Sequence, residues 1–334
     1  MKRPQVAVLD DYQALARGLA DWSAVDARGD VTVFTRPWRD EDQIAAKLAP
    51  FEVVVLLRER TAFPARLIER LPNLRMIAMT GNRTSTLDLA ACKARGIVVV
   101  HTDSGPPVAP AELAFALILA CARSVVRGHD NVVSGRWQEG IPMGMPLDGK
   151  RLGVVGLGKL GARVAGYARA FNMDVVAWSA NLTDEKAAAH GVRRVDKVEL
   201  FESSDVISVH YGLSERSRGI VGAAELQAMK AGAIFVNTSR GPLVDEAALI
   251  DVLRSGRITA GLDVYDIEPP PADWPLFDAP NVVVSPHLAG ATRQTAIRAA
   301  EIVAADVSAF LSGRRPAHVA NPAVLERLDL TEVR

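Results

Sequence analysis

Three residues with complementary chemistry, Arg240, Glu268 and His287, each stand shortly after an apolar run of the kind that forms a buried strand. Arginine offers a planar fork of donors for a carboxylate, and histidine changes charge near neutral pH. A carboxylate beside an imidazole favours its charged form and fixes which nitrogen carries the proton. In doubly wound sheets, ligands bind outside the carboxyl ends of the strands. The sequence therefore predicts a site that binds a small anion and transfers a proton, although Glu268 alone could be a surface residue before the following prolines.

A glycine-rich segment, Gly156-Leu157-Gly158-Lys159-Leu160-Gly161, follows one of these apolar runs and precedes a helix-like stretch at residues 163–171. The first glycine permits a tight turn, the second lets the backbone approach a pyrophosphate, and the third allows helix and strand to pack closely. The N-terminus of the helix adds free N–H groups and a partial positive charge. In this strand–turn–helix context the motif predicts binding of a nicotinamide dinucleotide.

Strand–helix alternation divides the chain into two α/β units. The expected strands of the first unit are residues 6–9, 31–35, 53–57, 74–79 and 97–100, with helices at 40–48, 64–71 and 87–95. Those of the second unit are 151–155, 174–178, 205–209, 233–237, 259–263 and 282–285, and a helix at 291–312 closes the chain. The rhythm breaks at residues 104–107, Ser-Gly-Pro-Pro, which indicates a boundary. A long apolar helix is expected next, at 108–128, buried in a core or against a partner subunit.

Composition excludes several functional classes. Lys plus Arg and Asp plus Glu both total 39, so no net field favours nucleic acid or membrane, and we expect neither as a partner. The longest apolar run, residues 113–122, is about half the roughly 20 residues that span a bilayer. The N-terminus shows no leader pattern, so a cytoplasmic setting is expected. Cys92 and Cys121 resemble no metal or redox pair, and no metal site is predicted.

The segments GLGKLG, NTSRGPLVDEAAL, GLDVYDIEP and NVVVSPHLAG resemble those of the D-isomer-specific 2-hydroxyacid dehydrogenases, in the same order and across about residues 58–321. Glu268 follows Arg240 by 28 positions and precedes His287 by 19, as in that family. The resemblance implies an α/β fold with two doubly wound domains. These are a flavodoxin-like substrate domain, 1–103 and 289–334, and a Rossmann dinucleotide-binding domain, 104–288.

The resemblance also implies hydride transfer between a nicotinamide cofactor and a 2-hydroxy acid/2-oxo acid pair, with Arg240, Glu268 and His287 as catalytic residues. A homodimer would form through the cofactor domain, by the helix at 108–128 and residues 136–145. Two alternatives stay open: oxidation of another small anion, such as phosphite, on the same scaffold, and a dinucleotide-sensing corepressor. His210 also ends a strand and is the rival histidine, but in related enzymes it lines the cofactor domain.

The expected cofactor residues lie in the glycine motif and at the ends of the strands of the second domain. They are Gly156, Gly158, Lys159, Leu160, Gly161, Ser179, His210, Ser217, Thr238, Arg240, Asp263, His287 and Gly290. Ser179 departs from the family because NAD-dependent members usually carry an acidic residue there. A neutral serine does not repel a 2′-phosphate, yet no arginine follows to hold one. We expect NAD, and NADP stays open.

The substrate residues expected besides Arg240 come from the first domain: Asn82, Arg83 and Arg60. In the family, a small apolar residue and a glycine supply the backbone N–H groups that bind the substrate carboxylate. Asn82 and Arg83 stand there instead. Arg60 and Arg83 could bind a second anionic group of the substrate, and the other interpretation is that both are solvated loop residues.

Overall fold

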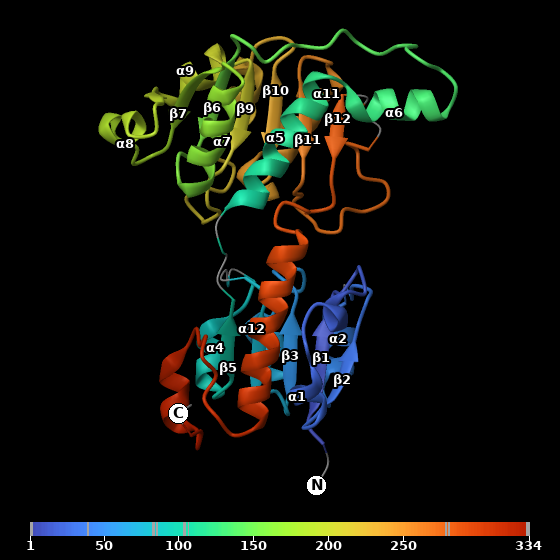
Figure 1. Ribbon diagram of the computed structural model, residues 1–334, viewed down its shortest axis with the longest axis vertical. Coiled ribbons are helices and arrows are strands. Elements are labelled where there is room, and N and C mark those ends of the chain that lie inside the picture. The colour runs from blue at the N-terminus through green and yellow to red at the C-terminus, as the bar shows by residue number, and fades with distance from the viewer. Residues whose placement is uncertain are drawn as a thin grey trace. The chain divides into compact units, whose positions relative to one another are not determined.

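The computed structural model describes residues 3–38, 40–81, 84, 86–102, 105, 107–277, 279 and 281–331. The chain divides into two units, one formed by Met1–Gly105 with Arg293–Arg334 and the other by Pro106–Thr292 (Figure 1). We call them the first and the second unit. Their boundaries fall two and four residues after those expected from the sequence.

The first unit is built on a five-stranded parallel sheet in the order β2-β1-β3-β4-β5. Its strands are β1 (Gln5–Leu9), β2 (Asp30–Val33), β3 (Val53–Leu56), β4 (Met76–Met79) and β5 (Val98–His101). Short runs of valine, isoleucine and methionine form these strands, except the partly exposed edge strand β2, because both faces of the sheet are buried. The order is that of flavodoxin-like folds, with a switch point between β1 and β3.

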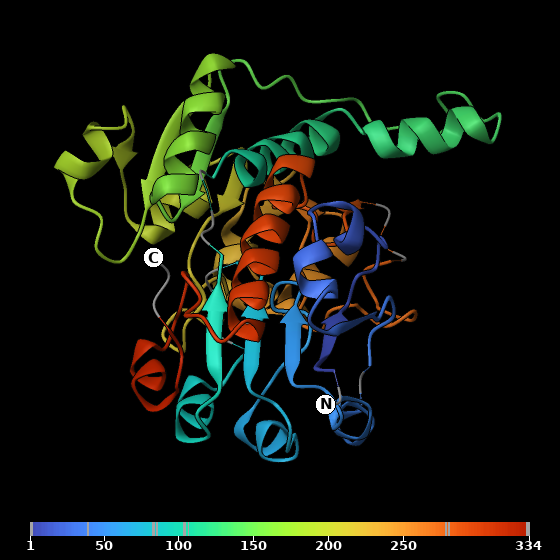
Figure 2. The same ribbon diagram turned by 60° about the horizontal axis from the view of Figure 1, so that its bottom comes forward.

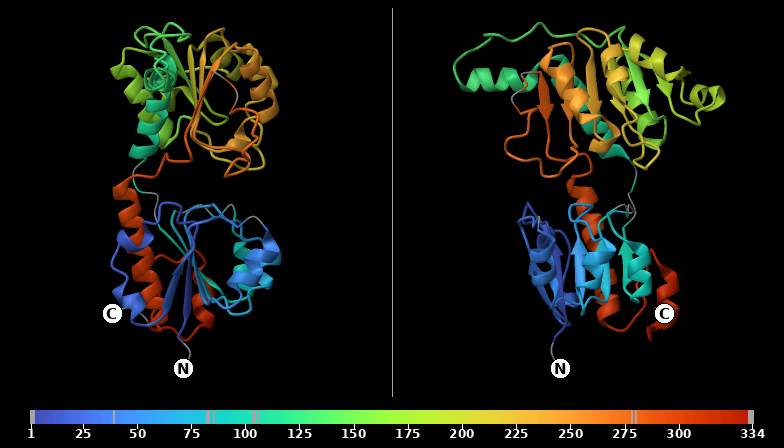
Figure 3. Two further views of the ribbon diagram at one scale, coloured as in Figure 1. Left: turned by 90° about the vertical axis from the view of Figure 1, so that its right-hand side faces the viewer. Right: turned by 180° about the vertical axis from the view of Figure 1, so that it is seen from behind.

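Helices cover both faces of this sheet (Figure 3, left panel). One face packs against α2 (Glu41–Leu48), α3 (Ala65–Glu69) and α4 (Leu89–Ala94). The other packs against α1 (Ser23–Asp26), the 3-10 helices η1 (Ala16–Gly18) and η3 (Pro322–Arg327), and the returning helix α12 (Arg293–Leu311). Asp40 and Asp88 cap α2 and α4 with their side chains, so the sequence itself marks where these helices begin.

The second unit is built on a seven-stranded parallel sheet in the order β12-β11-β10-β9-β6-β7-β8. The strands are β6 (Arg151–Val155), β7 (Asp174–Trp178), β8 (Arg193–Arg194), β9 (Val206–Val209), β10 (Ile234–Asn237), β11 (Thr259–Leu262) and β12 (Val282–Val284). Strand order reverses between β6 and β9, which is the switch point of a Rossmann sheet. The Rossmann and flavodoxin-like folds implied by the sequence are confirmed.

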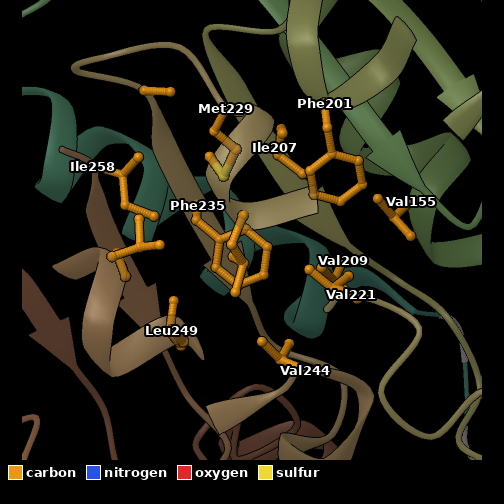
Figure 4. Packing of buried hydrophobic residues seen from close by; sticks show 14 of the residues in the cluster. Val155, Phe201, Ile207, Val209, Val221, Met229, Phe235, Val244, Leu249 and Ile258 are labelled. Carbon is orange, nitrogen blue, oxygen red and sulfur yellow. The ribbon is translucent and has the colours of Figure 1, made fainter. Parts of the chain in front are cut away.

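Two hydrophobic layers sandwich the second sheet. One face carries α5 (Val108–Ala122), α7 (Lys159–Ala170) and α8 (Asp184–Ala188). The other carries α9 (Lys197–Ser203), α10 (Ala223–Ala228) and α11 (Glu246–Arg254), and the 3-10 helix η2 (Gly241–Leu243) lies beside them. Figure 4 shows this second layer, in which Phe235 of β10 lies between side chains from β9 and the covering helices.

The prediction of a single helix at residues 108–128 is wrong. The segment forms α5 and a separate helix, α6 (Val125–Val133), bent by 62° relative to each other. The break lies at Ser124, whose backbone is left-handed with φ +48° and so cannot continue an α-helix. The inner face of α5 belongs to the core of its own unit, whereas α6 and the chain after it extend away from the sheet of the second unit (Figure 2).

The remaining differences from the sequence-based elements concern ends and short pieces. Most strands are one or two residues shorter than expected, and the two-residue strand β8 has no apolar signal because both of its residues are arginines. The terminal helix begins at Arg293 and not at 291.

Among the described residues, no single helix is long and apolar enough to cross a bilayer; α5 and α6 meet that criterion only when taken together. No cluster of three or more potential metal ligands occurs in the described part of the chain. Both cysteines are buried free thiols, and burial raises the pKa of each to about 12.

Candidate active site

His287 occupies a tight turn directly after β12. Its N–H donates to the carbonyl of Ser285 at 3.0 Å, and its backbone is left-handed with φ +53°. A non-glycine residue in this region costs about 1–3 kcal/mol, so neighbouring contacts must hold it there. The turn therefore fixes the direction of the imidazole at the expense of backbone strain.

Asp263, which follows β11, supplies those contacts. Its carboxylate accepts hydrogen bonds from Ser285 Oγ at 2.5 Å, from the Leu288 N–H at 2.7 Å and from the Ala289 N–H at 2.8 Å. The side chain is fully buried. Burial raises the pKa of the Asp263 carboxyl, and these three donors together with the charge of His287 oppose the rise. Asp263 thus anchors the turn that carries His287.

Glu268 pairs with the imidazole itself. His287 Nδ1 lies 2.5 Å from Glu268 Oε2, while Glu268 Oε1 accepts from the Tyr265 N–H at 3.0 Å. The Tyr265 hydroxyl donates to the Ser285 carbonyl at 2.8 Å, and burial raises the pKa of that hydroxyl, so it keeps its proton. The side chains of Glu268 and His287 are 31% and 26% exposed, so the pair is reached by solvent and by small ligands. With Nδ1 held by the carboxylate, Nε2 is the nitrogen left for a substrate.

Arg240 lies in a turn after β10 that is braced from both sides. Asn237 is buried; its amide donates to the Arg240 carbonyl at 2.9 Å and accepts from the Ser239 N–H at 3.0 Å. At Gly241 an added Cβ would collide with the backbone of Tyr265 and Asp266. Glycine is therefore required where the turn of Arg240 meets the segment that leads to Glu268.

The three residues predicted to be catalytic follow neighbouring strands, because β10 pairs with β11 and β11 with β12 in parallel register. Their carboxyl ends stand level: Asn237 is opposite Leu262, and Leu262 is opposite Val284. The structure brings Arg240, Glu268 and His287 to one edge of one sheet.

The glycine motif lies at the switch point, at the end of β6. Gly156 has φ +102°, and an added Cβ would meet the carbonyl oxygen of His210 at 2.7 Å. At Gly161 a Cβ would collide with the carbonyl of Gly156. At Gly158, by contrast, a Cβ would meet nothing within 4 Å, so the space beside this residue is open. Helix α7 starts directly after Gly158, and Lys159 and Leu160 begin its first turn, whose N–H groups have no acceptor within the helix.

The other predicted cofactor residues lie around the same edge. The Ser179 hydroxyl accepts from the Leu157 N–H at 3.0 Å. The Thr238 hydroxyl is buried without a hydrogen-bond partner among the described residues. Ser217 is buried, and its hydroxyl donates to the carbonyl of Gly212 at 2.7 Å, which closes the loop after β9. Gly290 lies in the turn after Ala289.

His210 follows β9 as a largely buried side chain, with Nε2 2.9 Å from Ser208 Oγ and Nδ1 shielded from solvent. Burial alone lowers its pKa to about 3. The ring is therefore neutral at physiological pH and carries no proton to donate as an imidazolium.

In the first unit, Arg60 follows β3 and is engaged by groups after β1. Its guanidinium donates to the Asp10 carbonyl at 2.5 Å and lies 4.5 Å from the ring centre of Tyr12. The buried Asp10 carboxylate accepts from the Thr61 hydroxyl at 2.6 Å. Burial raises the pKa of Asp10, and Thr61, Arg60 and Tyr12 oppose the rise. Asn82 and Arg83, the other predicted substrate residues, lie outside the described residues.

Comparisons with known proteins agree with this geometry. Residues 115–289 match the family model for the NAD binding domain of D-isomer specific 2-hydroxyacid dehydrogenases. A hydroxypyruvate reductase of Blautia hydrogenotrophica is 31% identical over 95% of this chain and 99% of its own length. The chain belongs to the D-isomer-specific 2-hydroxyacid dehydrogenase family.

Two further relatives of this chain are named for phosphoglycerate. The D-3-phosphoglycerate dehydrogenase of Archaeoglobus fulgidus is 37% identical over 81% of the chain, which spans about half (52%) of that longer protein. The crystal structure of a phosphoglycerate oxidoreductase from Vibrio cholerae O395 superposes with a TM-score of 0.82 at 39% identity, covering 90% of this chain and 96% of the other.

NAD is the cofactor of this family member, and the residues present fit it. The open side of Gly158 and the first turn of α7 suit a pyrophosphate. The buried Thr238 hydroxyl, at the end of β10, has no hydrogen-bond partner in the part of the chain that the structure describes, and it offers a polar group to the part of the cofactor nearer the catalytic residues. Position 179, where many Rossmann folds carry an acidic residue for the adenosine ribose, is a serine in this chain.

Sequence reasoning missed several residues that contact the predicted site residues within each unit. Asp10, Tyr12, Thr61 and Tyr265 were not singled out, and Asp263 was predicted for the cofactor and not for the turn of His287. Asp263 and Tyr265 both lie in the segment GLDVYDIEP, so the resemblance to the family could have indicated them. For Asp10 the sequence offers only a polar pair after a strand, which usually indicates a turn.

Proposed function

We propose that this chain catalyses reversible, NAD-dependent interconversion of a D-2-hydroxy acid and its 2-oxo acid, with His287 as the acid and base. The proposal rests on the 2.5 Å contact between His287 Nδ1 and the Glu268 carboxylate. The three residues lie in turns after neighbouring strands, Arg240 after β10, Glu268 after β11 and His287 after β12. An imidazole supported by a carboxylate can exchange a proton with the carbonyl oxygen of a 2-oxo acid, and an arginine at the same sheet edge can bind its carboxylate.

In this mechanism Arg240 binds the substrate. Its planar fork contacts the carboxylate and the neighbouring carbonyl oxygen at once, which fixes the orientation of the carbonyl carbon. NADH, when bound, supplies the hydride. As negative charge grows on the carbonyl oxygen, the Arg240 guanidinium stabilises it.

His287 moves the proton. Protonated Nε2 donates to the carbonyl oxygen during reduction, and neutral Nε2 removes the hydroxyl proton during oxidation. Glu268 stays on Nδ1 throughout, so its negative charge stabilises the imidazolium and keeps the ring in one orientation. Asp263 acts through the turn, because its three hydrogen bonds hold Ser285, Leu288 and Ala289, the residues on either side of His287.

For the substrate we propose a short 2-oxo acid with a second polar or anionic group. Two lines support this. Relatives are named for hydroxypyruvate and for 3-phosphoglycerate, which carry a hydroxyl and a phosphate beyond the reacting carbon. The first unit presents Arg60 at the carboxyl edge of its sheet, with Asp10 and Tyr12 beside it.

A homodimer through the second unit belongs to the same proposal. Helix α6 and residues 136–145, which we call the arm, expose apolar side chains, among them Trp137 at 68% and Met143 at 97% exposure. A hollow between α6, the arm and the ends of α5 and β12 lies beside them, lined by Ala122, Val126, Met145 and Val283. A surface of this kind suits a second copy of the chain.

The test is turnover of NADH, followed by its absorbance, with glyoxylate, pyruvate and hydroxypyruvate, and turnover of NAD with D-glycerate, D-3-phosphoglycerate and phosphite. The proposal expects activity on at least one carbon acid and preference for one with a second polar group. Turnover of phosphite alone would identify a different oxidation on the same scaffold. Tight NADH binding without turnover of any of these acids would favour a dinucleotide sensor.

A further inference from the structure

Tyr211 follows β9 and reaches across the end of β6 to the turn after β7. Its hydroxyl oxygen accepts from the Ala180 N–H at 3.3 Å, and its ring stacks on that of Trp178 with centroids 6.0 Å apart and planes inclined by 19°. Strands β7 and β9 are the two neighbours of β6 in the sheet. One side chain therefore bridges the strand ends on both sides of the glycine motif.

The backbone around Tyr211 is in close contact with that motif. A Cβ on Gly156 would lie 3.0 Å from the Tyr211 nitrogen, so the two segments pass each other as closely as glycine allows. On the other side, the Leu157 N–H donates to Ser179 Oγ at 3.0 Å. The loops after β6, β7 and β9 are thus joined at the switch point, where a Rossmann sheet binds its dinucleotide.

The hydroxyls of Tyr211 and Ser179 lie directly after β7, where a Rossmann fold usually carries an acidic side chain for the ribose. In the bonds described, both Tyr211 and Ser179 use an oxygen lone pair as acceptor, so each keeps its O–H proton for donation. A carboxylate can only accept hydrogen bonds from a ribose, whereas these groups donate to it. The two residues are partly exposed and approach the glycine motif at Gly156 and Leu157, shortly before the open space at Gly158.

We propose that Tyr211 is a specificity-determining residue of the cofactor site, whose hydroxyl, together with that of Ser179, donates to the 2′-oxygen of the adenosine ribose. The ring of Tyr211 forms the wall of the adenosine end of the site and is held in place by Trp178. The proposal concerns NAD binding and does not depend on which acid is the substrate.

The test compares Tyr211→Phe with the unaltered full chain, using calorimetry with two ligands: NADH and an NADH analogue that lacks the 2′-hydroxyl of the adenosine ribose. Removing one neutral hydrogen bond lowers affinity about 2- to 10-fold. We expect this loss for NADH and no loss for the deoxy analogue, because the analogue has already lost the partner. Phenylalanine keeps the stacking on Trp178, so the fold is retained.

Tyr167→Phe is the matched control. Tyr167 lies on α7 with its ring 6.0 Å from that of Phe115, inside the second unit and away from the strand ends. The control should bind both ligands as the unaltered chain does. An equal loss for both ligands in Tyr211→Phe would show that the hydroxyl only holds the loop at Ala180, and no loss for NADH would show that the ribose lies elsewhere; either result overturns the proposal.

A second variant, Ser179→Asp, tests the other half of the pair. A carboxylate accepts from the 2′-hydroxyl and repels a 2′-phosphate, so the ratio of NADH to NADPH affinity should rise by about 10-fold or more. An unchanged ratio would show that Ser179 does not face the ribose and would overturn the pairing. These are binding measurements, so a failed search for an acid substrate leaves them interpretable.

Discussion

At the scale of single residues, His287 is controlled through two separate attachments. Asp263 fixes its backbone through the turn, and Glu268 fixes its ring through Nδ1. Neither carboxylate uses the other's partner atoms, because they bind different parts of the same turn. The backbone position and the ring orientation of His287 are therefore set by different residues, and variants can separate them.

The proton-transfer role predicts the effect of His287→Asn. Asparagine tolerates the left-handed backbone at this position, whereas alanine would add strain. We expect kcat to fall by about 10²- to 10⁴-fold, the range of general acid–base catalysis, while NADH affinity barely changes. Steady-state kinetics with NADH titrations measure both quantities. His190→Asn, at an exposed histidine after α8, is the control and should retain full activity; a normal rate in His287→Asn would require another proton donor.

The Asp10 carboxylate and the Arg60 guanidinium lie together at the carboxyl end of the sheet in the first unit. The Asp10 carboxylate neutralises part of the positive charge that Arg60 would offer to a substrate. A buried charge needs such a partner in the absence of a ligand. The balance between the two decides whether this end of the sheet favours a neutral or an anionic group.

Asp10→Asn should therefore shift substrate preference towards anions. Asparagine keeps an oxygen for the Thr61 hydroxyl and tolerates φ +59°, so the local fold is preserved. We expect kcat/KM for D-3-phosphoglycerate, relative to D-glycerate, to rise about 10-fold, the effect of strengthening one charge-assisted contact. Asp42→Asn removes an equally negative but exposed group on α2 and should leave the ratio unchanged. If Asp10→Asn and Asp42→Asn have the same ratio of kcat/KM for the two substrates, Asp10 and Arg60 only stabilise the ends of β1 and β3.

At the scale of elements, the sequence predicts what depends on local pattern. The strands were predicted from short β-branched runs, and the catalytic edge from the rule that parallel strands end together. The break at Ser124 was not predicted, because the apolar pattern continues across it and only the backbone turns. The role of Asp10 was not predicted either, since its partners Arg60 and Thr61 lie 50 and 51 positions away along the chain.

The strand β9 illustrates how burial of an element makes stability depend on pH. His210 at its end has a pKa of about 3 in the folded protein, because burial penalises the charged ring, against an ordinary value of 6.5. Between these values the unfolded chain binds a proton that the folded chain does not, so folding stability falls as the pH drops below 6.5.

Replacing this histidine should therefore flatten the pH dependence. From pH 7 to pH 5 His210 accounts for a loss of about 2 kcal/mol in the free energy of unfolding. Because glutamine does not titrate, the free energy of unfolding of His210→Gln should fall by about 2 kcal/mol less than that of the unaltered chain over this pH interval. Urea unfolding followed by circular dichroism measures both. His190→Gln, at an exposed position after α8, is the control. Equal slopes for His210→Gln and the unaltered chain would indicate that the buried ring becomes charged without unfolding.

At the scale of the whole molecule, the chain passes from the first unit into the second and returns. Helix α12 packs on the sheet of the first unit, with Val303, Val307 and Phe310 in the same core as β1 and β3. Residues far apart in sequence thus complete one domain. Exposed apolar side chains of the second unit gather on α6 and the arm: Val125, Val126, Val132, Val133, Trp137 and Met143.

That surface predicts the assembly state. Light scattering of the purified protein should give about twice the chain mass of 35.8 kDa, because the proposed dimer covers the exposed apolar residues of α6 and the arm with a second copy. A stable interface buries about 800 Å² on each partner, much of its centre apolar. The double variant Val133→Lys and Met143→Lys places two charges at side chains that are 74% and 97% exposed, where they cannot disturb the core. It should run as a monomer at the same protein concentration and keep its NADH affinity. Val198→Lys, on an exposed apolar residue of α9 away from the arm, should remain a dimer. A monomeric unaltered chain, or a double variant that still dimerises, would place the interface elsewhere or remove it.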